Sequence, residues 1–573
     1  MLMVRHLLTG LGCWLCLLRF AGGQSVEWCR LYIQSEERGF FPKAAVADSQ
    51  GNLIVAGRYI RSGGHYSVAM FKYSPTGSLL WATTFGTSGE SDFAEAVAVA
   101  PDDSIFLATT RANTDSTAYV HKYTPSGALL WTQAINLSAY DVITQLVPRG
   151  NGGVEVLLAY GSGGIGYARL IYDTSGNLTA SHPFPQPNTW MSNRTPVGMV
   201  PIDTAHTLLI VQDPEVEEVL QTYPRTRLQV INSAGMIVAE SVLPLRAARY
   251  GHDAEGTFYL LGDYWNPSAQ QMRLCVARVD ANLQVLGLWE IGSADGDAIP
   301  DVLVVSGGSW LVSGGVEGTT ARGMAVEVRR SDGSLLRAQA EVGALRPVAG
   351  ASLPGAFALL IGVLESAPER WQPQIHWWRT NGQWMGGRLL TPLAQADALP
   401  EQIVASPDGA LYVVATVNRD GDNMAGAGIW RIRGLPSLVG RVNLQSFVGN
   451  PATRTAQFDL SDGSQTDSVS LPLGANGEYA LTTLLTGSVQ VRVWVPGWLA
   501  KRQTLTLNGT VHANWDLLNG DANHDNIIDD ADLLMVLFNF GQSGPNPADL
   551  NGDGSVDDAD LLMVLFNFGT IGD

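Results

Sequence analysis

Two acidic segments near the end of the chain carry the residues best suited to bind a metal ion. They read DANHDNIIDDAD at 521–532 and DLNGDGSVDDAD at 549–560, with oxygen-bearing side chains at positions 1, 3, 5, 9 and 12 of each. Calcium prefers six to eight oxygen ligands, position 7 supplying a backbone carbonyl. We therefore predict two Ca²⁺ sites. The predicted ligands are Asp521, Asn523, Asp525, Ile527, Asp529 and Asp532 in the first loop, and Asp549, Asn551, Asp553, Ser555, Asp557 and Asp560 in the second.

Both loops run into the same apolar sequence, which we expect to form a helix. It reads DDADLLMVLFNFG at 529–541 and again at 557–569. The twelfth residue of each loop opens the helix, and the acidic residues beside it suit the positive N-terminal end of a helix dipole. In the first helix we expect Leu533, Leu537 and Phe540 to lie on one face. Two complete copies argue against the alternative of acidic, solvated loops without metal.

The acidity of the chain is concentrated in this segment. The 573 residues include 54 Asp+Glu and 35 Lys+Arg, which gives a net charge of −19 and a pI of about 4.8. This balance argues against nucleic acid as a partner, because such binding needs a basic surface. Residues 515–573 contain twelve Asp and no Lys, Arg or Glu. Without calcium, these clustered carboxylates should repel one another and loosen the segment.

Residues 519–569 resemble a type I dockerin, a module with two F-hand calcium loops of the spacing D-x-N-x-D-x-x-x-D-x-x-D. The resemblance implies attachment of a secreted protein to a cohesin module on a scaffold, with recognition centred on loop positions 10 and 11 and the helix behind them. Those positions are Asp530-Ala531 and Asp558-Ala559 here, in place of the Ser/Thr-type pairs common in cellulosomes. A structural calcium module without a cohesin partner is the alternative.

Most of the chain is built from a repeat of about 50 residues. The sequence FKYSPTGSLLW at 71–81 recurs as HKYTPSGALLW at 121–131, and each copy indicates a β-hairpin. A further strand pattern alternates with the hairpins, as in GNLIVAG at 51–57. Four short strands per repeat, counted eight times, predict an eight-bladed β-propeller over 24–435, with the strand at 26–33 completing the last blade. Seven blades remain an alternative because residues 181–250 are irregular, and a β-solenoid or a string of sandwiches is another.

The repeats resemble bacterial propeller repeats of the SBBP type, through Val46 to Gly57 and Phe71 to Trp81. This resemblance implies a fold and no single activity. A similar G-x-x-x-W pattern occurs in PQQ-dependent dehydrogenases, and Gly77/Trp81 and Gly127/Trp131 fit it. The alternative interpretation is that Trp81 and Trp131 simply pack one blade against the next.

The remaining segments complete the predicted organisation. Residues 1–23 have the charged start, apolar stretch and small-residue end of a signal peptide, which predicts a secreted or cell-surface protein with no membrane span in the mature chain. Residues 436–514 contain alternating strands that predict a small immunoglobulin-like β-sandwich. Within it, Trp494 and Trp498 are candidates for carbohydrate contact or for simple packing. Residues 515–573 form the predicted α-helical, paired-F-hand domain.

Three functions are compatible with this organisation. The first is a secreted, non-catalytic binding protein whose propeller is an interaction platform for a carbohydrate or protein and whose calcium tail attaches it to a cohesin-like scaffold. The second is a polysaccharide-degrading enzyme, a glycoside hydrolase or lyase, with a carboxylate pair in the central groove. The third is a purely structural calcium protein. Candidate carboxylates for the enzyme are Asp92, Glu95, Asp141, Asp263 and Asp301.

Overall fold

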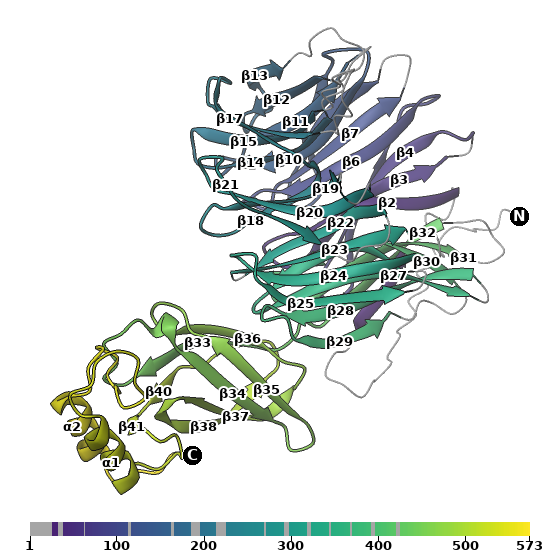
Figure 1. Cartoon of the computed structure of the whole chain (residues 1–573). Coiled ribbons are helices and arrows are strands. Elements are labelled where there is room, and N and C mark those ends of the chain that lie inside the picture. Colours follow the sequence, from purple (N-terminus) through teal and green to yellow (C-terminus); the bar gives the residue numbers. More distant parts are fainter. Residues whose placement is uncertain are drawn as a thin grey trace, which may run out of the picture. The chain divides into compact units, whose positions relative to one another are not determined.

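The chain is mainly β and divides into two compact units (Figure 1). One unit spans Val26–Leu353 and Phe357–Arg433, and the other spans Gly434–Asp573 with Pro354–Ala356. The predicted signal peptide lies outside the described residues. The computed structural model describes residues 26–32, 38–61, 63–112, 116–161, 166–184, 195–213, 225–266, 268, 271–291, 297–306, 308–317, 322–342, 345–366, 369–390, 396–419 and 425–573.

The described part of the first unit contains eight four-stranded sheets. Seven are made of four consecutive strands, and the eighth combines three late strands with the N-terminal one. The strands of the seven are β2 (Arg38–Ala47), β3 (Leu53–Ile60), β4 (Tyr66–Tyr73), β5 (Leu79–Phe85); β6 (Ser91–Val99), β7 (Ile105–Ala112), β8 (Thr117–Tyr123), β9 (Leu129–Ile135); β10 (Asp141–Pro148), β11 (Val154–Tyr160), β12 (Gly166–Tyr172), β13 (Leu178–Phe184); β14 (Thr195–Pro201), β15 (His206–Asp213), β16 (Arg225–Asn232), β17 (Ile237–Leu243); β18 (Arg246–His252), β19 (Phe258–Asn266), β20 (Gln271–Val279), β21 (Val285–Ile291); β22 (Asp297–Ser306), β23 (Ser309–Glu317), β24 (Arg322–Arg330), β25 (Leu335–Val342); β26 (Leu345–Leu353), β27 (Ala356–Ser366), β28 (Glu369–Arg379) and β29 (Trp384–Leu389). The eighth sheet consists of β30 (Ala396–Ala405), β31 (Leu411–Arg419), β32 (Ala425–Ile432) and β1 (Val26–Tyr32).

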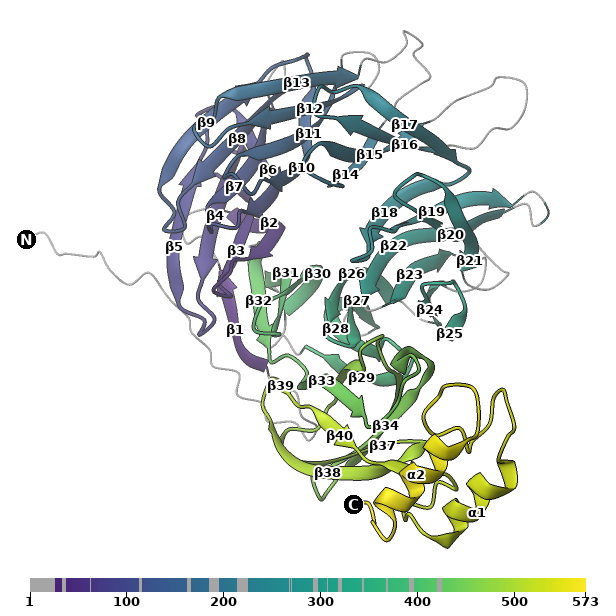
Figure 2. The same cartoon turned by 90° about the vertical axis from the view of Figure 1, so that its left-hand side faces the viewer.

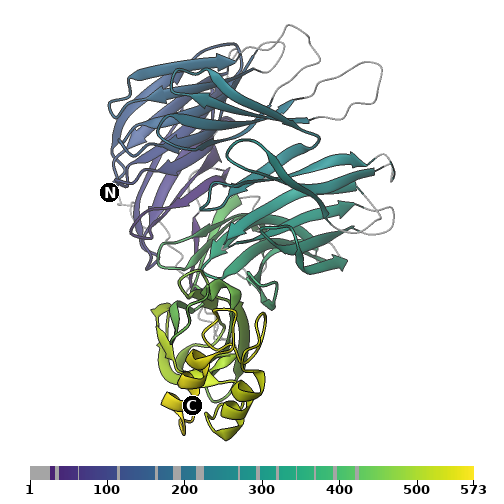
Figure 3. The ribbon, with the colours of Figure 1, turned by 60° about the vertical axis from the view of Figure 1, so that its left-hand side comes forward.

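The sheets follow one another around a ring (Figures 2 and 3), and the first strand of each sheet is innermost (Figure 2). Each first strand contacts the first strand of the next sheet, and β30 contacts both β26 and β2. The middle strands β3 and β4 are almost wholly buried, whereas β5 is half-buried to exposed. Burial on both faces explains the continuous apolar runs of the middle strands. The prediction of a mainly β, propeller-like architecture is confirmed.

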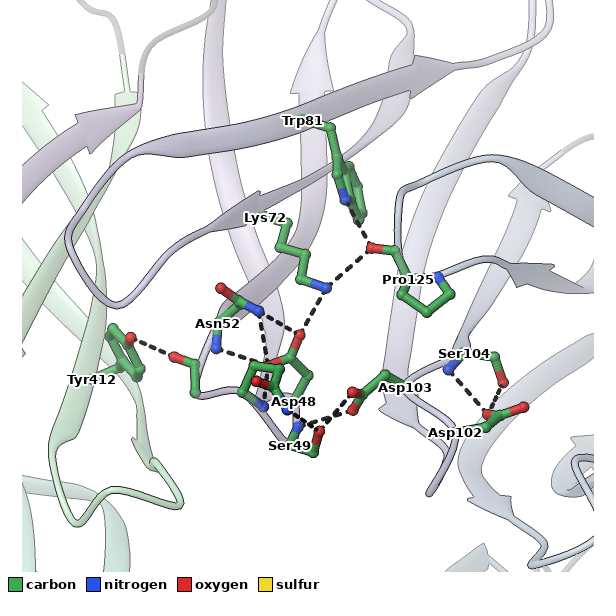
Figure 4. A network of polar contacts seen from close by, with 12 residues as sticks. Asp48, Ser49, Asn52, Lys72, Trp81, Asp102, Asp103, Ser104, Pro125 and Tyr412 are labelled. Atoms are coloured by element: carbon green, nitrogen blue, oxygen red, sulfur yellow. Dashed lines mark hydrogen bonds and ion pairs between the residues drawn. The ribbon is translucent and has the colours of Figure 1, made fainter.

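The G-x-x-x-W pattern packs adjacent sheets against each other. The indole N–H of Trp81, on β5, donates to the carbonyl of Pro125 in the next sheet at 3.2 Å, and Lys72 donates to the same carbonyl at 3.0 Å (Figure 4). Gly127 lies under the Trp81 ring with φ +85°, and a Cβ there would be 2.7 Å from that ring. Trp131 donates in the same way to the Thr174 carbonyl at 3.0 Å. The glycine is required both by its left-handed backbone and by the indole above it.

The N-terminal strand makes the same kind of contact between the eighth sheet and the first. β1 pairs antiparallel with β32, so it forms the outer edge of the eighth sheet. Its Trp28 donates to the carbonyl of Pro75 in the first sheet at 2.7 Å, and a Cβ at Gly77 would lie 2.9 Å from the Trp28 ring. The first and eighth sheets are therefore joined both by β1 and by an indole on a glycine.

The second unit packs two sheets around one core. Phe458, Tyr479, Trp498 and Trp515 are among its buried side chains. The sheets have the strand orders β36-β33-β39, with β40 also on β33, and β35-β34-β37-β38-β41. The elements are β33 (Ser437–Leu444), the 3₁₀ helix η1 (Pro451–Thr453), β34 (Thr455–Ser461), β35 (Thr466–Pro472), β36 (Glu478–Thr482), β37 (Gly487–Val495), β38 (Gly497–Leu507), β39 (Thr510–His512), β40 (Trp515–Leu517), β41 (Asn519–Asp521), α1 (Asp530–Asn539) and α2 (Asp558–Asn567).

The sheets of this unit extend into the acidic tail. β40 pairs with β33, and β41 pairs with β38, although both strands follow residue 514. Trp515 is fully buried, and its indole donates to the Tyr479 hydroxyl at 2.8 Å. The change in composition at 515 therefore does not coincide with the end of the sheets. Trp498 is also buried, as the packing interpretation of this residue expects.

Neither helix of the described chain is long and apolar enough to cross a membrane.

The packing of Trp81 on Gly127 gives a direct test of how adjacent sheets are held together. Gly127→Ala should destabilise the first unit by about 1–3 kcal/mol beyond the backbone strain, because the new methyl group overlaps the indole. Gly89→Ala is the matched control, since Gly89 has φ +82° and a Cβ added there would have no heavy atom within 4 Å. Calorimetry of the two full-length variants measures the difference, and equal destabilisation would contradict this packing role.

Candidate functional site

The first acidic loop is closed by hydrogen bonds between its own backbone and side chains. Asp521 at position 1 accepts the N–H groups of Asp525 and Asn526, each at 3.0 Å. Asn523 at position 3 accepts the N–H of Asp525 at 2.9 Å. Asp532 at position 12 accepts the N–H of Asn523 at 3.0 Å. Side chains from both ends of the loop are thus turned toward its interior.

The second loop has a similar network, in which the position-1 carboxylate accepts from positions 4 and 6 instead of positions 5 and 6. Asp549 accepts the N–H groups of Gly552 at 2.9 Å and Gly554 at 3.0 Å. Asp560 accepts the N–H of Asn551 at 3.1 Å. The sharp turns use positive φ at Gly552 and Gly554, and at His524 and Asn526 in the first loop. Each loop therefore turns sharply twice, at positions 4 and 6.

Positions 9 and 12 also start the helices. The side chain of Asp529 accepts the N–H of Ala531, while Asp532 accepts the Asp529 N–H at 2.9 Å. Asp557 and Asp560 form the same capping box on α2. Because one carboxylate serves both the loop and the cap, any ion bound in a loop would also bear on the first turn of its helix.

The backbone at position 7 fits a ligand role. The side chains at position 5, Asp525 and Asp553, accept the N–H groups of Ile527 and Ser555, each at 2.9 Å. The carbonyls at positions 6 and 8 accept backbone hydrogen bonds from glycines outside the loops. Within the described chain, the carbonyls of Ile527 and Ser555 accept none of the backbone bonds outside helices and strands. Both carbonyls keep their lone pairs for another partner.

The loops bury carboxylates without a positively charged side chain from their own segment. Asp532 and Asp560 are 0% exposed and Asp521 is 3% exposed, and residues 515–573 contain no Lys or Arg. Burial raises the pKa of Asp521, and the carboxylates of Asp532 and Asp525 raise it further. Burial also raises the pKa of Asp560, with a smaller contribution from Asp549. A bound divalent cation would remove this electrostatic cost.

The donor types fit calcium. Each loop combines carboxylates, one Asn side chain and one backbone carbonyl, which are the hard oxygen ligands that calcium takes. Among the described residues, no three His, Cys, Asp or Glu side chains already stand together as a metal-holding group. The assignment of the individual ligands therefore stays a prediction from their spacing.

The two helices expose an apolar surface. Val536 and Val564 are buried at the helix–helix core, together with Ile528 and Val556 from the loops. Leu537 and Phe540, expected on one face, are both exposed, while Leu533 is half-buried. The exposed apolar side chains, here called the helix surface, include Phe538 at 80% and Phe566 at 82% exposure. The rest of this surface consists of Leu534, Leu537, Phe540, Leu562, Leu565 and Phe568.

Contacts from the segment after β33 and from β38 hold both loops in place. The N–H of Val448 donates to the carbonyl of Asn551 in the second loop at 2.9 Å. Phe447 lies over the same loop, where a Cβ at Gly552 would be 2.1 Å from its ring. The N–H of Ala500, on β38, donates to Asn526 Oδ1 in the first loop at 2.7 Å. No local sequence signal marks these contacts, because the partners lie far apart in the chain.

Three of the five carboxylates considered for catalysis have structural partners in the first unit. Asp92 accepts the Thr87 N–H at 2.8 Å and pairs with Arg111 at 2.9 Å. Asp141 is fully buried and accepts the Leu137 N–H at 2.7 Å. The third, Asp263, accepts from Arg246 at 2.9 Å.

Glu95 and Asp301 are the other two candidates. They lie on β6 and β22, the first strands of their sheets, and burial raises the pKa of both. Asp92 and Asp141 also lie on first strands, β6 and β10, so of the five candidates only Asp263, on β19, lies away from the inner strands of the ring.

No family model matches the chain, and no curated protein matches it. One solved structure that is similar to part of this chain is a type II cohesin–X–dockerin complex from Acetivibrio cellulolyticus. The match covers 24% of this chain and 97% of the chain in that complex, at 20% identity and a TM-score of 0.22. A second match is the β-propeller domain of the trilobed protease from Pyrococcus furiosus. It covers 62% of this chain and 99% of that chain, at 12% identity and a TM-score of 0.38. A third match is Sqt1 from Chaetomium thermophilum. It covers 70% of this chain and 99% of that chain, at 10% identity and a TM-score of 0.40.

Contact between Phe447 and the second loop predicts that the sheets and the tail unfold together. Phe447→Ala should lower the free energy of unfolding of the second unit by about 1–3 kcal/mol, somewhat less than the loss of a fully buried Phe. Phe538→Ala removes the same ring from a side chain that is 80% exposed and should leave the stability unchanged. Thermal unfolding of the full chain in calcium compares the two, and similar effects would contradict the contact.

Proposed function

We propose that this is a secreted, non-catalytic binding protein, in which the propeller is an interaction platform and the second unit is a calcium-dependent attachment module. In this proposal each four-stranded sheet is one blade of an eight-bladed propeller. The sheets of the second unit are an immunoglobulin-like module, and the two acidic loops are dockerin-like F-hands. Secretion rests on the predicted signal peptide at 1–23.

One observation carries the calcium assignment. Two loops with the same ligand spacing share the hydrogen bond from the position-3 N–H to the position-12 carboxylate, and both bury that carboxylate, of Asp532 and of Asp560, completely. Burial of unpaired carboxylates is costly unless a cation or a proton compensates them. Since residues 515–573 contain no basic side chain other than His524, which is exposed, calcium is the compensating charge that the oxygen donors favour.

The helix surface supports the attachment role. Two Phe side chains of this surface are more than three-quarters exposed, and Leu and Phe side chains neighbour them. Exposure of such an apolar surface to water is unfavourable, which is typical of a site that binds another protein. Asp530 and Asp558 lie at the helix starts and add negative charge beside it. A cohesin-like protein with an apolar docking face is the partner we propose, and calcium would hold the two helices in the arrangement that presents the surface.

Calcium uptake tests the metal assignment. The full chain should bind two Ca²⁺ ions in isothermal titration, whereas Asp532→Asn combined with Asp560→Asn should lose both, because position 12 links loop and helix in each copy. Asp530→Asn combined with Asp558→Asn is the matched control, which removes two carboxylates from the same loops without touching a predicted ligand. Undiminished uptake by the first variant, or no uptake by the wild-type chain, would refute the assignment.

Attachment is tested with immobilised cohesin modules in calcium. The wild-type chain should be retained, and Phe538→Ala combined with Phe566→Ala should weaken retention by at least about tenfold, since exposed aromatic anchors dominate such interfaces. Val448→Ala alters a side chain that is 70% exposed in the same unit but off the helices, and should bind like the wild type. Failure of the wild-type chain to bind any cohesin, with calcium uptake intact, would favour a purely structural calcium module.

A further inference from the structure

The innermost strands of the ring share a β-bulge. In seven of them the described register skips one residue, which a bulge leaves unpaired and re-aims. The preceding residue is buried in most of these strands, whereas the skipped residue is half-buried or exposed. These strands line the inside of the ring (Figure 2). The skipped residues are Lys43, Glu95, Thr144, Val197, Ala248, Asp301 and Glu401.

Six successive inner strands carry charged side chains of alternating sign, five of them at or directly after a bulge and the sixth, Arg346, near the start of β26. In order around the ring they are positive on β18, β26 and β2 and negative on β22, β30 and β6. We call this set the axial charge ring. It consists of Arg249, Asp301, Arg346, Glu401, Lys43 and Glu95.

Neighbouring members of the axial charge ring lie within electrostatic range. Burial raises the pKa of Asp301, and Arg346 and Arg249 on the flanking strands oppose that rise. Burial likewise raises the pKa of Glu401, against the opposing effect of Arg346 and Lys43.

Glu95 continues the pattern beside Lys43. Burial raises its pKa, and the ammonium group of Lys43 and the guanidinium of Arg58 act in the other direction. Each of the three carboxylates therefore has two cations near it.

Within the described chain, the charged groups of the axial charge ring do not form ion pairs with one another. Among the ion pairs of the described residues, with N···O up to 4.0 Å, none joins two members of the axial charge ring. Two of its carboxylates instead accept hydrogen bonds from their own sheets. Asp301 accepts the Gly315 N–H at 3.0 Å, and Glu401 accepts the Thr416 hydroxyl at 2.9 Å. Cationic donors and carboxylate acceptors therefore alternate around the axis, and no ion pair of the described residues joins them to each other.

The strands that carry the ring are fixed to one another. Gln402, next to Glu401, donates to the carbonyl of Lys43 at 3.0 Å and accepts the N–H of Ala45 at 2.6 Å. On the other side of the ring, Arg249 donates to the backbone carbonyl of Asp301 at 2.8 Å. The charged side chains thus stand on a preorganised frame, which lowers the entropic cost of binding.

We propose that the axial charge ring binds a neutral, polyhydroxylated ligand, the exposed end of an oligosaccharide. Each sugar hydroxyl can donate to a carboxylate and accept from an ammonium or guanidinium group, so vicinal hydroxyls match an alternation of acceptors and donors. A small anion or cation would instead meet a like charge at every second position. The proposal rests on the proposed role of the propeller as a binding platform and names the class of its ligand.

Titration calorimetry of the full chain tests this proposal with cellohexaose, xylohexaose and mannohexaose as probes. At least one neutral hexasaccharide should bind, and Glu401→Gln and Lys43→Met should each weaken that binding by at least about tenfold, the usual effect of removing a charged hydrogen-bond partner. Glu255→Gln, which neutralises an exposed carboxylate in the turn between β18 and β19, is the control and should bind like the wild type. Two variants of opposite charge guard against a folding defect in either one.

The same titration in EDTA separates this proposal from the calcium assignment. Sugar binding should persist in EDTA, because no member of the axial charge ring belongs to the second unit. Absence of binding by all three hexasaccharides, or equal affinity of Glu401→Gln, Lys43→Met and wild type, would overturn the axial site even with calcium uptake intact. Retained sugar binding in a chain that takes up no calcium would overturn only the attachment module.

Discussion

The second unit depends on one electrostatic constraint, the burial of carboxylates in a segment that has no Lys or Arg. Asp532 and Asp560 each close a loop and cap a helix, so their charge state bears on both structures at once. The helices contribute a small shared core around Val536 and Val564 and expose most of their Leu and Phe side chains. In our proposal, a cation in each loop would supply stabilisation that the small core lacks. On this proposal, the helix surface would depend on the loops holding their shape.

The first unit is held by a different and repeated interaction. An indole from one sheet covers a glycine of the next and donates to a carbonyl of the same turn, at Trp28, Trp81 and Trp131. Trp289 also lies over Gly333, but elsewhere the residue over the glycine changes, with His182 over Gly235 and Leu336 beside Gly382. The ring tolerates these changes because the inner strands also contact each other around the axis. Because the sheets are held in this way, the side chains on the innermost strands are free to vary. The axial charge ring lies on these strands.

Local patterns made the hairpins, the calcium-loop spacing and the helices predictable, because each depends on residues close in sequence. The pairing of β40 with β33, the contact of Phe447 with Gly552 and the orientation of the helices were not predictable, since each depends on distant segments. Asp92 and Asp141 were candidates for chemistry but accept backbone N–H groups of the preceding loops. The axial charge ring is scattered over more than 350 residues, from Lys43 to Glu401. Its one sequence signal is a Pro before the skipped residue, as at Pro42, Pro300 and Pro400.

Hydrogen exchange of the full chain, compared between calcium and EDTA, tests the central claim most directly. In calcium, the amides of Asp525, Asn526, Gly552 and Gly554 should be protected, because they donate to the position-1 carboxylates that an ion would hold. In EDTA these amides and those of α1 and α2 should exchange faster by at least about tenfold, while the amides of β3 and β4 stay protected. Equal protection of the loops in both conditions would contradict the account.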